Sequence, residues 1–405
     1  MIGALGQVLA YIVPFLLVLT LVVTIHELGH FLVARAFRVK IDRFAIGFGR
    51  AVFSRTDRQG VEWRVGWMPL GGYVKFAGDL DASSVPDQAG LAELRQRIIA
   101  EEGPGAERAY FHFKPVWQRA LVTAAGPVAN FILAIVIFTV LFSVVGVELR
   151  PANVAQVQPG SPAATAGFRA GDVITAVNGK TITDAGEVTR VVALSSGDPV
   201  RFTVERGAQV MQITATPERR VENDPIAGKI SVGRIGLGLA SSAADVRHIR
   251  YNPVEAVGQG VRETGAVLGT TLTYLGRIVT GRESGDQLSG PLGIAKASGA
   301  LTNAAVKANP DPVYIAANLA MTLTSFAAIL SIGIGFLNLL PIPILDGGHL
   351  VFYAYEAVAR RPVAARVQEA GYRVGLALLA GLMLFATWND LQKLNLFKFL
   401  GGLVS

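Results

Sequence analysis

Long apolar runs are the feature that most restricts the fold of this chain. No charged residue precedes Glu27, and none occurs in residues 120–147, 312–345 or 374–389. About 20 apolar residues suffice for a helix to cross a bilayer, and a helix satisfies its own backbone hydrogen bonds there. With 51% hydrophobic residues, 17% charged residues and a mean hydropathy of +0.43, the chain is predicted to be a polytopic α-helical membrane protein with four transmembrane helices.

Two histidines and a glutamate interrupt the end of the first apolar run. His26 and His30 are four residues apart, so they project from the same face of a helix, with Glu27 beside them. This is the spacing with which a helix holds one zinc ion between two imidazoles. Zinc makes water more acidic, and a neighbouring glutamate can accept the proton as that water attacks a carbonyl. A chance pattern on a surface helix is the alternative, but ionisable groups inside an apolar span are costly and usually functional.

A zinc site in this chain needs a third protein ligand without sulfur. The chain contains no cysteine, which excludes disulfides and thiolate metal sites and leaves nitrogen and oxygen ligands. Asp346 is the only carboxylate in the last membrane-associated run with a turn forced beside it, by two prolines and two glycines. We therefore predict one Zn²⁺ per chain, held by His26, His30 and Asp346. Two alternatives remain open: Asp346 as a helix cap, and His349 as a competing ligand.

The first apolar run and its flank set the predicted orientation. The run lacks a basic preceding region and an A-x-A cleavage site, so we interpret it as a retained transmembrane helix rather than a signal peptide. Arg35, Arg38, Lys40 and Arg43 follow it, which places this end and the zinc toward the cytoplasm. The net charge of +7 indicates contact with the anionic lipid bilayer rather than nucleic acid, because no basic run of five or more occurs.

A β-rich segment follows the first run. Residues 39–53 and 61–76 alternate apolar and polar side chains around a polar turn, which predicts a β-hairpin. Non-helical backbone enters a membrane only where it lines protein or a wet cavity. We predict a hairpin that dips into the membrane from the cytoplasmic side and holds an extended substrate as an added strand at Gly71, Gly72 and Tyr73. An ordinary cytosolic hairpin is the alternative.

Residues 150–242 have the character of a soluble α+β domain. The strings Gly160-Ser161-Pro162-Ala163-Ala164, Gly171-Asp172-Val173-Ile174 and Val177-Asn178-Gly179-Lys180 resemble a circularly permuted PDZ domain of the protease-associated kind. The resemblance implies a glycine loop and a peptide-pairing strand at Ile235, Gly236, Leu237 and Gly238, which would take up a peptide or a substrate ectodomain by strand addition. One such domain is visible.

These features predict an order of segments along the chain. Residues 252–280 form an apolar-faced helix that is too polar to span, so the segment around it is expected at the membrane surface. The predicted order is a first transmembrane helix (1–37), a cytoplasmic, membrane-reentrant β region and loop with a helix at 88–101 (38–118), a second transmembrane helix (119–147), an extracytoplasmic PDZ domain (150–242), an amphipathic membrane-surface segment (243–311), a third transmembrane helix (312–349), a cytoplasmic segment (350–372), a fourth transmembrane helix (373–390) and a tail (391–405).

The two halves of the predicted site together resemble a known family. His26-Glu27-x-x-His30 on the first span and Asn338-x-x-Pro-x-Pro-x-Leu-Asp346-Gly347 on a later one are similar to the motifs of the site-2 intramembrane zinc metalloproteases. The single PDZ domain is similar to the bacterial RseP-like group, whose best-known enterobacterial member has two. The resemblance implies zinc at the three ligands named above, Glu27 as the general base and Asn338 as a substrate-contacting residue.

The resemblance also implies an activity and a location. It predicts a zinc metalloendopeptidase of the bacterial inner membrane that cuts a pre-trimmed, single-span membrane protein in or near its transmembrane helix. The implied substrate is an anti-sigma factor, cut after a first, outside cleavage in regulated intramembrane proteolysis, with signal-peptide remnants as further substrates. The position of the PDZ domain between the second and third spans predicts a size filter on the outer side, with recruitment of substrate as the alternative.

A non-enzymatic membrane receptor is the alternative from another class. In that hypothesis the PDZ domain binds the partner and zinc only joins the spans. Structural zinc usually has four protein ligands, and three are proposed here, which favours catalysis.

Overall fold

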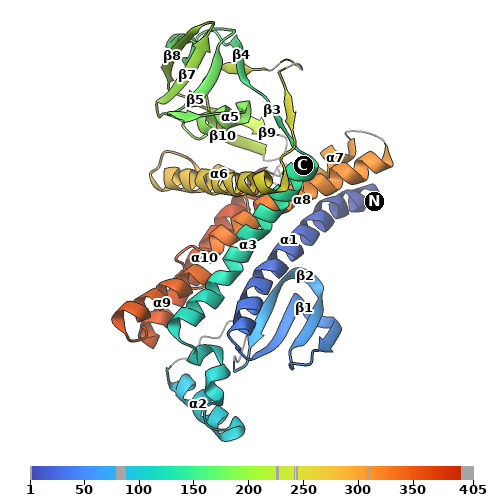
Figure 1. Cartoon of the computed structure of the whole chain (residues 1–405), viewed down its shortest axis with the longest axis vertical. Coiled ribbons are helices and arrows are strands. Elements are labelled where there is room, and N and C mark those ends of the chain that lie inside the picture. Colours follow the sequence, from blue (N-terminus) through green and yellow to red (C-terminus); the bar gives the residue numbers. More distant parts are fainter. Residues whose placement is uncertain are drawn as a thin grey trace, which may run out of the picture. The chain divides into compact units, whose positions relative to one another are not determined.

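The computed structural model describes residues 2–78, 88–224, 228–240, 242, 245–307 and 311–393 (Figure 1). Four of its helices contain a segment that is long and apolar enough to cross a membrane, which confirms the four apolar helices predicted from hydropathy. These helices are α1 (Ile2–Ala36), α3 (Val116–Val144), α8 (Pro312–Asn338) and α10 (Ala365–Lys393). The predicted tail beyond Lys393 and the loop at residues 79–87 lie outside the described residues.

The helix α10 starts earlier in the chain than the fourth span that the charge pattern predicts. The helix α9 (Asp346–Ala359) is closed by its C-cap residue Arg360, which has a left-handed backbone (φ 54°), and Pro362 follows. α10 then begins at Ala365, ahead of the predicted start of the fourth span at 373. Charged residues mark where a bilayer would end, but a helix continues past that point as long as its backbone is unbroken. Most of the segment 350–372 is therefore helical.

The chain divides into two compact units, Met1–Ile137 with Ile294–Phe385 and Phe138–Gly293 with Ala386–Ser405. The first unit holds the β region, made of β1 (Ile41–Thr56) and β2 (Glu62–Phe76), and the helix α2 (Gln88–Glu102), close to the predicted 88–101. It also holds the short 3-10 turns η1 (Ala106–Ala109) and η2 (Phe111–Phe113).

The two long strands β1 and β2 fold back on each other into four strand segments. Residues 43–46 pair with 72–75 on one side and with 62–65 on the other, while 51–56 pair with 62–66. The lateral order is therefore 51–56, 62–66, the first half of β1 and the last half of β2. Gly47 (φ 77°) lies at the bend in β1, and a side chain there would place its Cβ only 2.7 Å from the Met68 carbonyl oxygen. This folding leaves the last half of β2 at one edge of the sheet.

The β region is fixed to α1 just beyond the histidines. Phe31 of α1 is buried and contacts Phe44 and Trp63 edge-on, with ring centroids 5.3 Å and 5.1 Å apart. Aromatic packing of this kind contributes about 0.5–1.5 kcal/mol per pair beyond the area it buries. Thr20 Oγ1 also donates a hydrogen bond to the Pro69 carbonyl oxygen (2.6 Å). The strands therefore lie along the same helix that carries the histidines (Figure 1).

The second unit is built around a sheet of order β11-β4-β5-β7-β8, with β6 paired to β5. Its strands alternate inward and outward residues, and Val154, Val188, Phe202 and Val204 lie in the core with two packed helices. The strands are β4 (Ala152–Val157), β5 (Val173–Val177), β6 (Lys180–Thr181), β7 (Val200–Arg206), β8 (Gln209–Ala215) and β11 (Leu237–Leu239), and the helices are α4 (Pro162–Ala166) and α5 (Ala185–Ala193).

One buried ion pair joins the strands of this sheet domain. Both Asp172 carboxylate oxygens accept hydrogen bonds from Arg206, at 2.6 Å and 2.8 Å. The Asp172 side chain is fully buried, and the hydrogen bond from Arg206 holds the pKa of its carboxyl below the usual value. The carboxylate thus stays charged and paired in the interior, so removal of Arg206 would leave a buried charge uncompensated.

The second unit contains further elements outside this sheet. β9 (Glu218–Asp224) and β10 (Gly228–Arg234) form a hairpin that the sequence pattern did not predict. β3 (Val147–Leu149) pairs with β12 (Arg247–Ile249), which brings the two ends of the domain together. The remaining elements of this unit are α6 (Pro253–Val279) and η3 (Gly285–Gln287), and the helix α7 (Pro291–Lys307) starts in it and continues into the first unit.

Candidate metal centre

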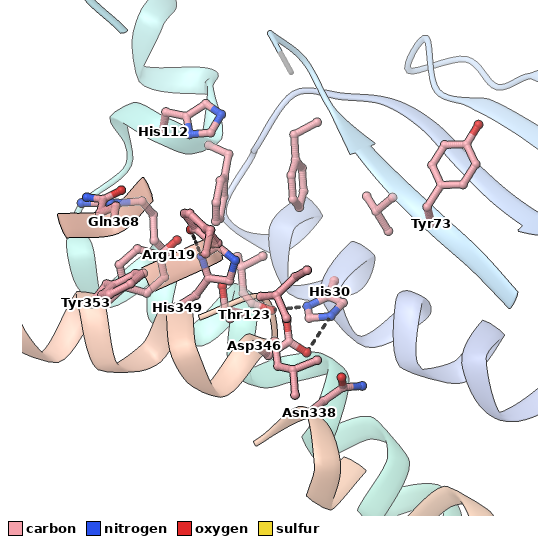
Figure 2. A pocket seen from close by; sticks show the side chains of 18 of the residues that line it. His30, Tyr73, His112, Arg119, Thr123, Asn338, Asp346, His349, Tyr353 and Gln368 are labelled. Carbon is pink, nitrogen blue, oxygen red and sulfur yellow. Dashed lines mark hydrogen bonds and ion pairs between the residues drawn. The ribbon is translucent and has the colours of Figure 1, made fainter. Parts of the chain in front are cut away.

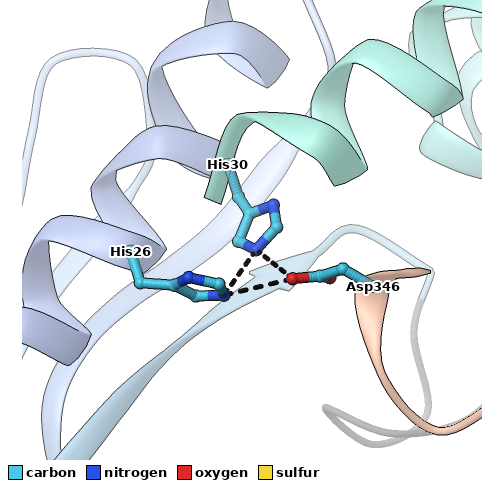
Figure 3. A group of neighbouring side chains, drawn as sticks. All are labelled: His26, His30 and Asp346. Atoms are coloured by element: carbon cyan, nitrogen blue, oxygen red, sulfur yellow. Dashed lines mark hydrogen bonds and ion pairs between the residues drawn. The ribbon is translucent and has the colours of Figure 1, made fainter. Parts of the chain in front are cut away.

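The candidate metal centre begins on α1, where His26 and His30 point to one side (Figure 3). Their Nε2 atoms lie 3.2 Å apart. His26 is 6% exposed, so its ring is removed from solvent inside the helix bundle. The predicted spacing on one helical face is therefore realised at atomic distances.

Asp346 reaches the two rings from the start of α9. Its Oδ2 lies 3.2 Å from His26 Nε2 and 3.5 Å from His30 Nε2. In the described part of the chain these three residues form a group whose possible ligand atoms all lie within 4.8 Å of one another. The N-cap residue of α9 is Leu345, without a side-chain cap bond, and the Asp346 carboxylate faces the histidines. The helix-cap alternative therefore does not describe this aspartate.

The turn that positions Asp346 depends on prolines, which lack an amide hydrogen, and on glycines, which lack a side chain. α8 ends at Asn338, and two prolines follow before α9 starts. A Cβ on Gly347 would lie 2.3 Å from the Leu339 carbonyl oxygen, and one on Gly348 would lie 2.2 Å from that of Ile342. Only glycine fits such close approaches, so the Asp-Gly-Gly sequence allows the turn to pack under the start of α9.

The helix α3 covers the other side of the histidines and determines which nitrogen of His30 carries the ring hydrogen. His30 Nδ1 donates to the Val122 carbonyl oxygen (2.8 Å), which can only accept, so the hydrogen of the neutral ring is on Nδ1 and the Nε2 lone pair is free. That lone pair, His26 Nε2 and an Asp346 oxygen converge within 3.5 Å. These atoms repel one another unless a ring hydrogen or a cation lies among them. Two imidazole nitrogens and one carboxylate oxygen are also donors that zinc accepts, so the residues fit a zinc ion.

Gly126 of α3 makes room for this convergence. A Cβ at position 126 would lie 2.3 Å from His30 Nε2 and 2.9 Å from His26 Cε1. Any side chain there would displace both rings, which explains a glycine in the middle of a transmembrane helix.

Glu27 faces the β region rather than the three ligands. The backbone N–H of Val74 donates to Glu27 Oε2 (3.2 Å), and Gly72 lies against the Glu27 side chain. Among the predicted substrate-contacting residues, Gly71 and Gly72 thus lie at α1, whereas the Tyr73 hydroxyl accepts from Arg43 (3.2 Å). Asn338, at the end of α8, places Nδ2 3.4 Å from His26 Nε2.

The site opens into a cavity of about 860 Å³ (Figure 2). His349 lines this cavity but is outside the cluster of three ligands, and its Nδ1 shares a hydrogen bond with the Tyr372 hydroxyl (3.4 Å). Arg119 and Glu356 also line it and form an ion pair (2.6 Å). The cavity therefore offers polar groups for water and peptide beside the candidate metal ligands.

Sequence reasoning missed the contribution of the second span to this site. On α3, Val122 contacts His30, Asn130 contacts His26 and Gly126 lies against both rings. The available signal was the small-residue stretch with a lone asparagine, which indicates close helix packing but not what packs there.

Comparison with known proteins supports the chemistry that this geometry indicates. Residues 14–382 match the family model described as peptidase family M50. The chain is 47% identical to metalloprotease MmpA of Caulobacter vibrioides over 98% of both chains. It is 43% identical to a putative zinc metalloprotease of Agrobacterium fabrum over 97% of this chain and 98% of that one, and 32% identical to one of Rickettsia conorii over 95% and 99%. The chain therefore belongs to peptidase family M50, the site-2 protease family, and is a zinc metalloprotease with membrane-spanning helices.

Proposed function

We propose that this protein hydrolyses a peptide bond in or near the transmembrane helix of a single-span membrane protein that has already been trimmed outside the membrane. The observation that carries the proposal is the convergence of His26, His30 and Asp346 inside a bundle of apolar helices. An anti-sigma factor is the proposed substrate, and signal-peptide remnants are a second class. Purified, zinc-loaded protein should cut a single-span reporter, and failure to cut any trimmed reporter would contradict the proposal.

The proposed roles follow from where each side chain lies. His26, His30 and Asp346 would hold zinc, which supplies Lewis-acid chemistry that polarises a carbonyl and strengthens water as a nucleophile. Glu27 accepts the proton of the attacking water and passes it to the leaving amine. The Val74 N–H fixes one Glu27 oxygen and leaves the other for that proton transfer. Asn338, beside His26, is placed to donate to the substrate carbonyl.

The edge of the β region is the proposed binding place for an unwound substrate. A transmembrane helix hides its peptide bonds in internal hydrogen bonds, so it must unwind before cleavage. In the described residues the outer edge of β2 has no strand partner, and its Val74 N–H points at Glu27. A substrate strand added there would pass the catalytic carboxylate. Apolar side chains exposed on these strands support entry into the membrane: Phe48, Val52, Phe53, Trp67 and Leu70.

Disulfide crosslinking tests this edge. Leu70→Cys lies in the last half of β2 and Val52→Cys in the opposite edge segment, and both positions are exposed. With Glu27→Gln present to trap the substrate, a reporter with one cysteine should crosslink to position 70 and not to position 52, because a disulfide needs Cα atoms within about 7 Å. The chain has no native cysteine to interfere. Equal crosslinking at both positions would argue against strand addition at this edge.

We propose that the sheet domain at 150–242 is a PDZ domain. The supporting features are the two helices α4 and α5 and the antiparallel pairing of β11 with β4. Gly236 has φ 81°, and its missing Cβ would lie 2.3 Å from Ser161, so the loop before β11 requires glycine. Ile235 is buried in the domain core, so only its backbone is available to a peptide. Gly236, Leu237 and Gly238 present the strand proposed to pair with a substrate ectodomain.

The proposed topology places the zinc site toward the cytoplasm and the sheet domain outside the bacterial inner membrane. Arginines and lysines after α1 and the arginines at 360–361 support this orientation. Single cysteines at Arg58 and Val210, both exposed, test it with a membrane-impermeant maleimide. Val210→Cys should label in intact spheroplasts and Arg58→Cys only after lysis. The reverse pattern would invert the topology.

A size filter is the proposed role of the PDZ domain. The pairing of β3 with β12 holds the ends of the domain side by side, so residues 151–245 can be replaced by a short Gly/Ser linker. This deletion should keep zinc and permit cleavage of an untrimmed substrate that the full chain rejects. A deletion variant that keeps zinc but loses cleavage of the trimmed substrate would show recruitment instead.

A further inference from the structure

Asn130 is a buried polar residue in the middle of α3 with a contact to a proposed zinc ligand. It is fully buried, and its Nδ2 lies 3.3 Å from His26 Nδ1. Its Oδ1 is also buried and has no hydrogen-bond partner in the described part of the chain. A buried amide oxygen without a donor costs about 1–3 kcal/mol, so its persistence needs an explanation.

The Nδ1 atoms of the two histidines, which face away from the metal site, have different neighbours. The Val122 carbonyl oxygen can only accept, so it places the hydrogen of His30 on Nδ1. Nε2 of His26 faces Asp346 and His30, so Nε2 is the atom directed at the metal site. A neutral imidazole that binds metal through Nε2 carries its hydrogen on Nδ1, and that hydrogen needs an acceptor.

The amide of Asn130 supplies this acceptor after a half turn about its Cβ–Cγ bond. The oxygen and nitrogen of the amide then exchange places without other change in shape. Oδ1 then faces His26 Nδ1–H and gains a donor, while the amide NH2 group takes the position that has no partner in the described part of the chain.

Helix packing holds Asn130 at the required place. Gly126 and Asn130 are four residues apart on α3, and they contact the two histidines that are four residues apart on α1. From the other side, Ser331 Oγ of α8 donates to the backbone carbonyl oxygen of Asn130 (2.9 Å). The asparagine is therefore fixed between α1 and α8.

We propose that Asn130 is a positioning residue of the zinc site, whose Oδ1 accepts from His26 Nδ1–H and holds that ring with Nε2 toward the metal. Asn130 itself touches neither zinc nor substrate. The inference rests on the proposed ligand set and extends it to α3: one histidine is oriented by a backbone carbonyl and the other by a side-chain amide.

Two substitutions of similar size separate hydrogen bonding from packing. Asn130→Asp keeps an acceptor at the same place, and Asn130→Leu removes it. Loss of such an outer partner typically weakens metal affinity by about 10–100-fold. In competition with a chromogenic chelator, full-length Asn130→Leu should bind zinc about 10–100-fold more weakly than the unmodified protein, whereas Asn130→Asp should stay within about threefold. Ser331→Ala is the control for helix packing: it removes a hydrogen bond to the Asn130 backbone but keeps the Asn130 side chain, so it should weaken zinc binding less than Asn130→Leu does.

The outcomes distinguish this inference from the proposed ligand set. Unchanged zinc affinity in Asn130→Leu, or an equal loss in Asn130→Asp and Asn130→Leu, would overturn the positioning role. Thermal unfolding of the metal-free variants detects a packing defect, which should be absent from a variant that fails only in zinc binding. His26→Ala is measured beside them. If it keeps zinc, the ligand set itself is wrong, whereas zinc loss in His26→Ala with full affinity in Asn130→Leu rejects only the role of Asn130.

Discussion

Glu27→Gln is expected to lower the rate of peptide cleavage by at least about 10²–10⁴-fold while zinc stays bound, because general-base catalysis contributes about this factor. Glutamine has nearly the same shape and can still bond the Val74 N–H through its amide oxygen, but it cannot accept a proton from water. The measurement is single-turnover cleavage of a trimmed single-span reporter, together with the zinc content of the same preparation.

This variant also separates the peptidase from the receptor hypothesis. A receptor in which zinc only joins the spans has no use for a base at position 27, so its partner binding would be unaffected. Glu27→Asp is the informative control, because it keeps a carboxylate but withdraws it from the substrate and should retain part of the activity. Undiminished processing by Glu27→Gln would refute water activation by Glu27.

Single substitutions of the three proposed ligands should each remove most of the zinc. His26→Ala, His30→Ala and Asp346→Ala leave two protein ligands where a catalytic zinc normally has three. Zinc affinity should therefore fall by more than about 100-fold, the largest loss that is typical for removing a group that only hydrogen-bonds a ligand. Cleavage should fall with zinc occupancy. Zinc per chain, measured after dialysis against a weak chelator, gives the result directly.

His349→Ala is the matched control for the ligand set. His349 lines the same cavity and follows Asp346 closely in sequence, but its Nδ1 bonds the Tyr372 hydroxyl and it is outside the ligand cluster. It should keep near-stoichiometric zinc. If Asp346→Ala keeps its zinc while His349→Ala loses it, the third ligand was misassigned.

The sequence by itself determined the elements whose signals are local. Apolar runs indicated the four candidate spans because a bilayer-length helix is encoded by composition over about 20 residues. The i, i+4 spacing of His26 and His30 predicted one helical face because helix geometry is the same wherever the helix lies. The β alternation on both sides of Asp57 likewise predicted two strands and their turn.

Tertiary structure alone decided how distant segments meet. The fold-back of β1 and β2, which leaves the Gly72 edge beside Glu27, depends on cross-strand pairing that alternation cannot assign. The hairpin β9–β10 and the start of α10 at Ala365 were likewise absent from local patterns.

The fullest example is the surroundings of the zinc ligands. Glycine at 126 and asparagine at 130 look like ordinary packing residues of a membrane helix until α3 is placed against α1. Which nitrogen of His30 carries hydrogen is decided by the Val122 carbonyl oxygen on another helix. Sequence patterns report the periodicity of one element, whereas hydrogen bonds and van der Waals contacts between elements depend on their relative positions, which only the packed structure supplies.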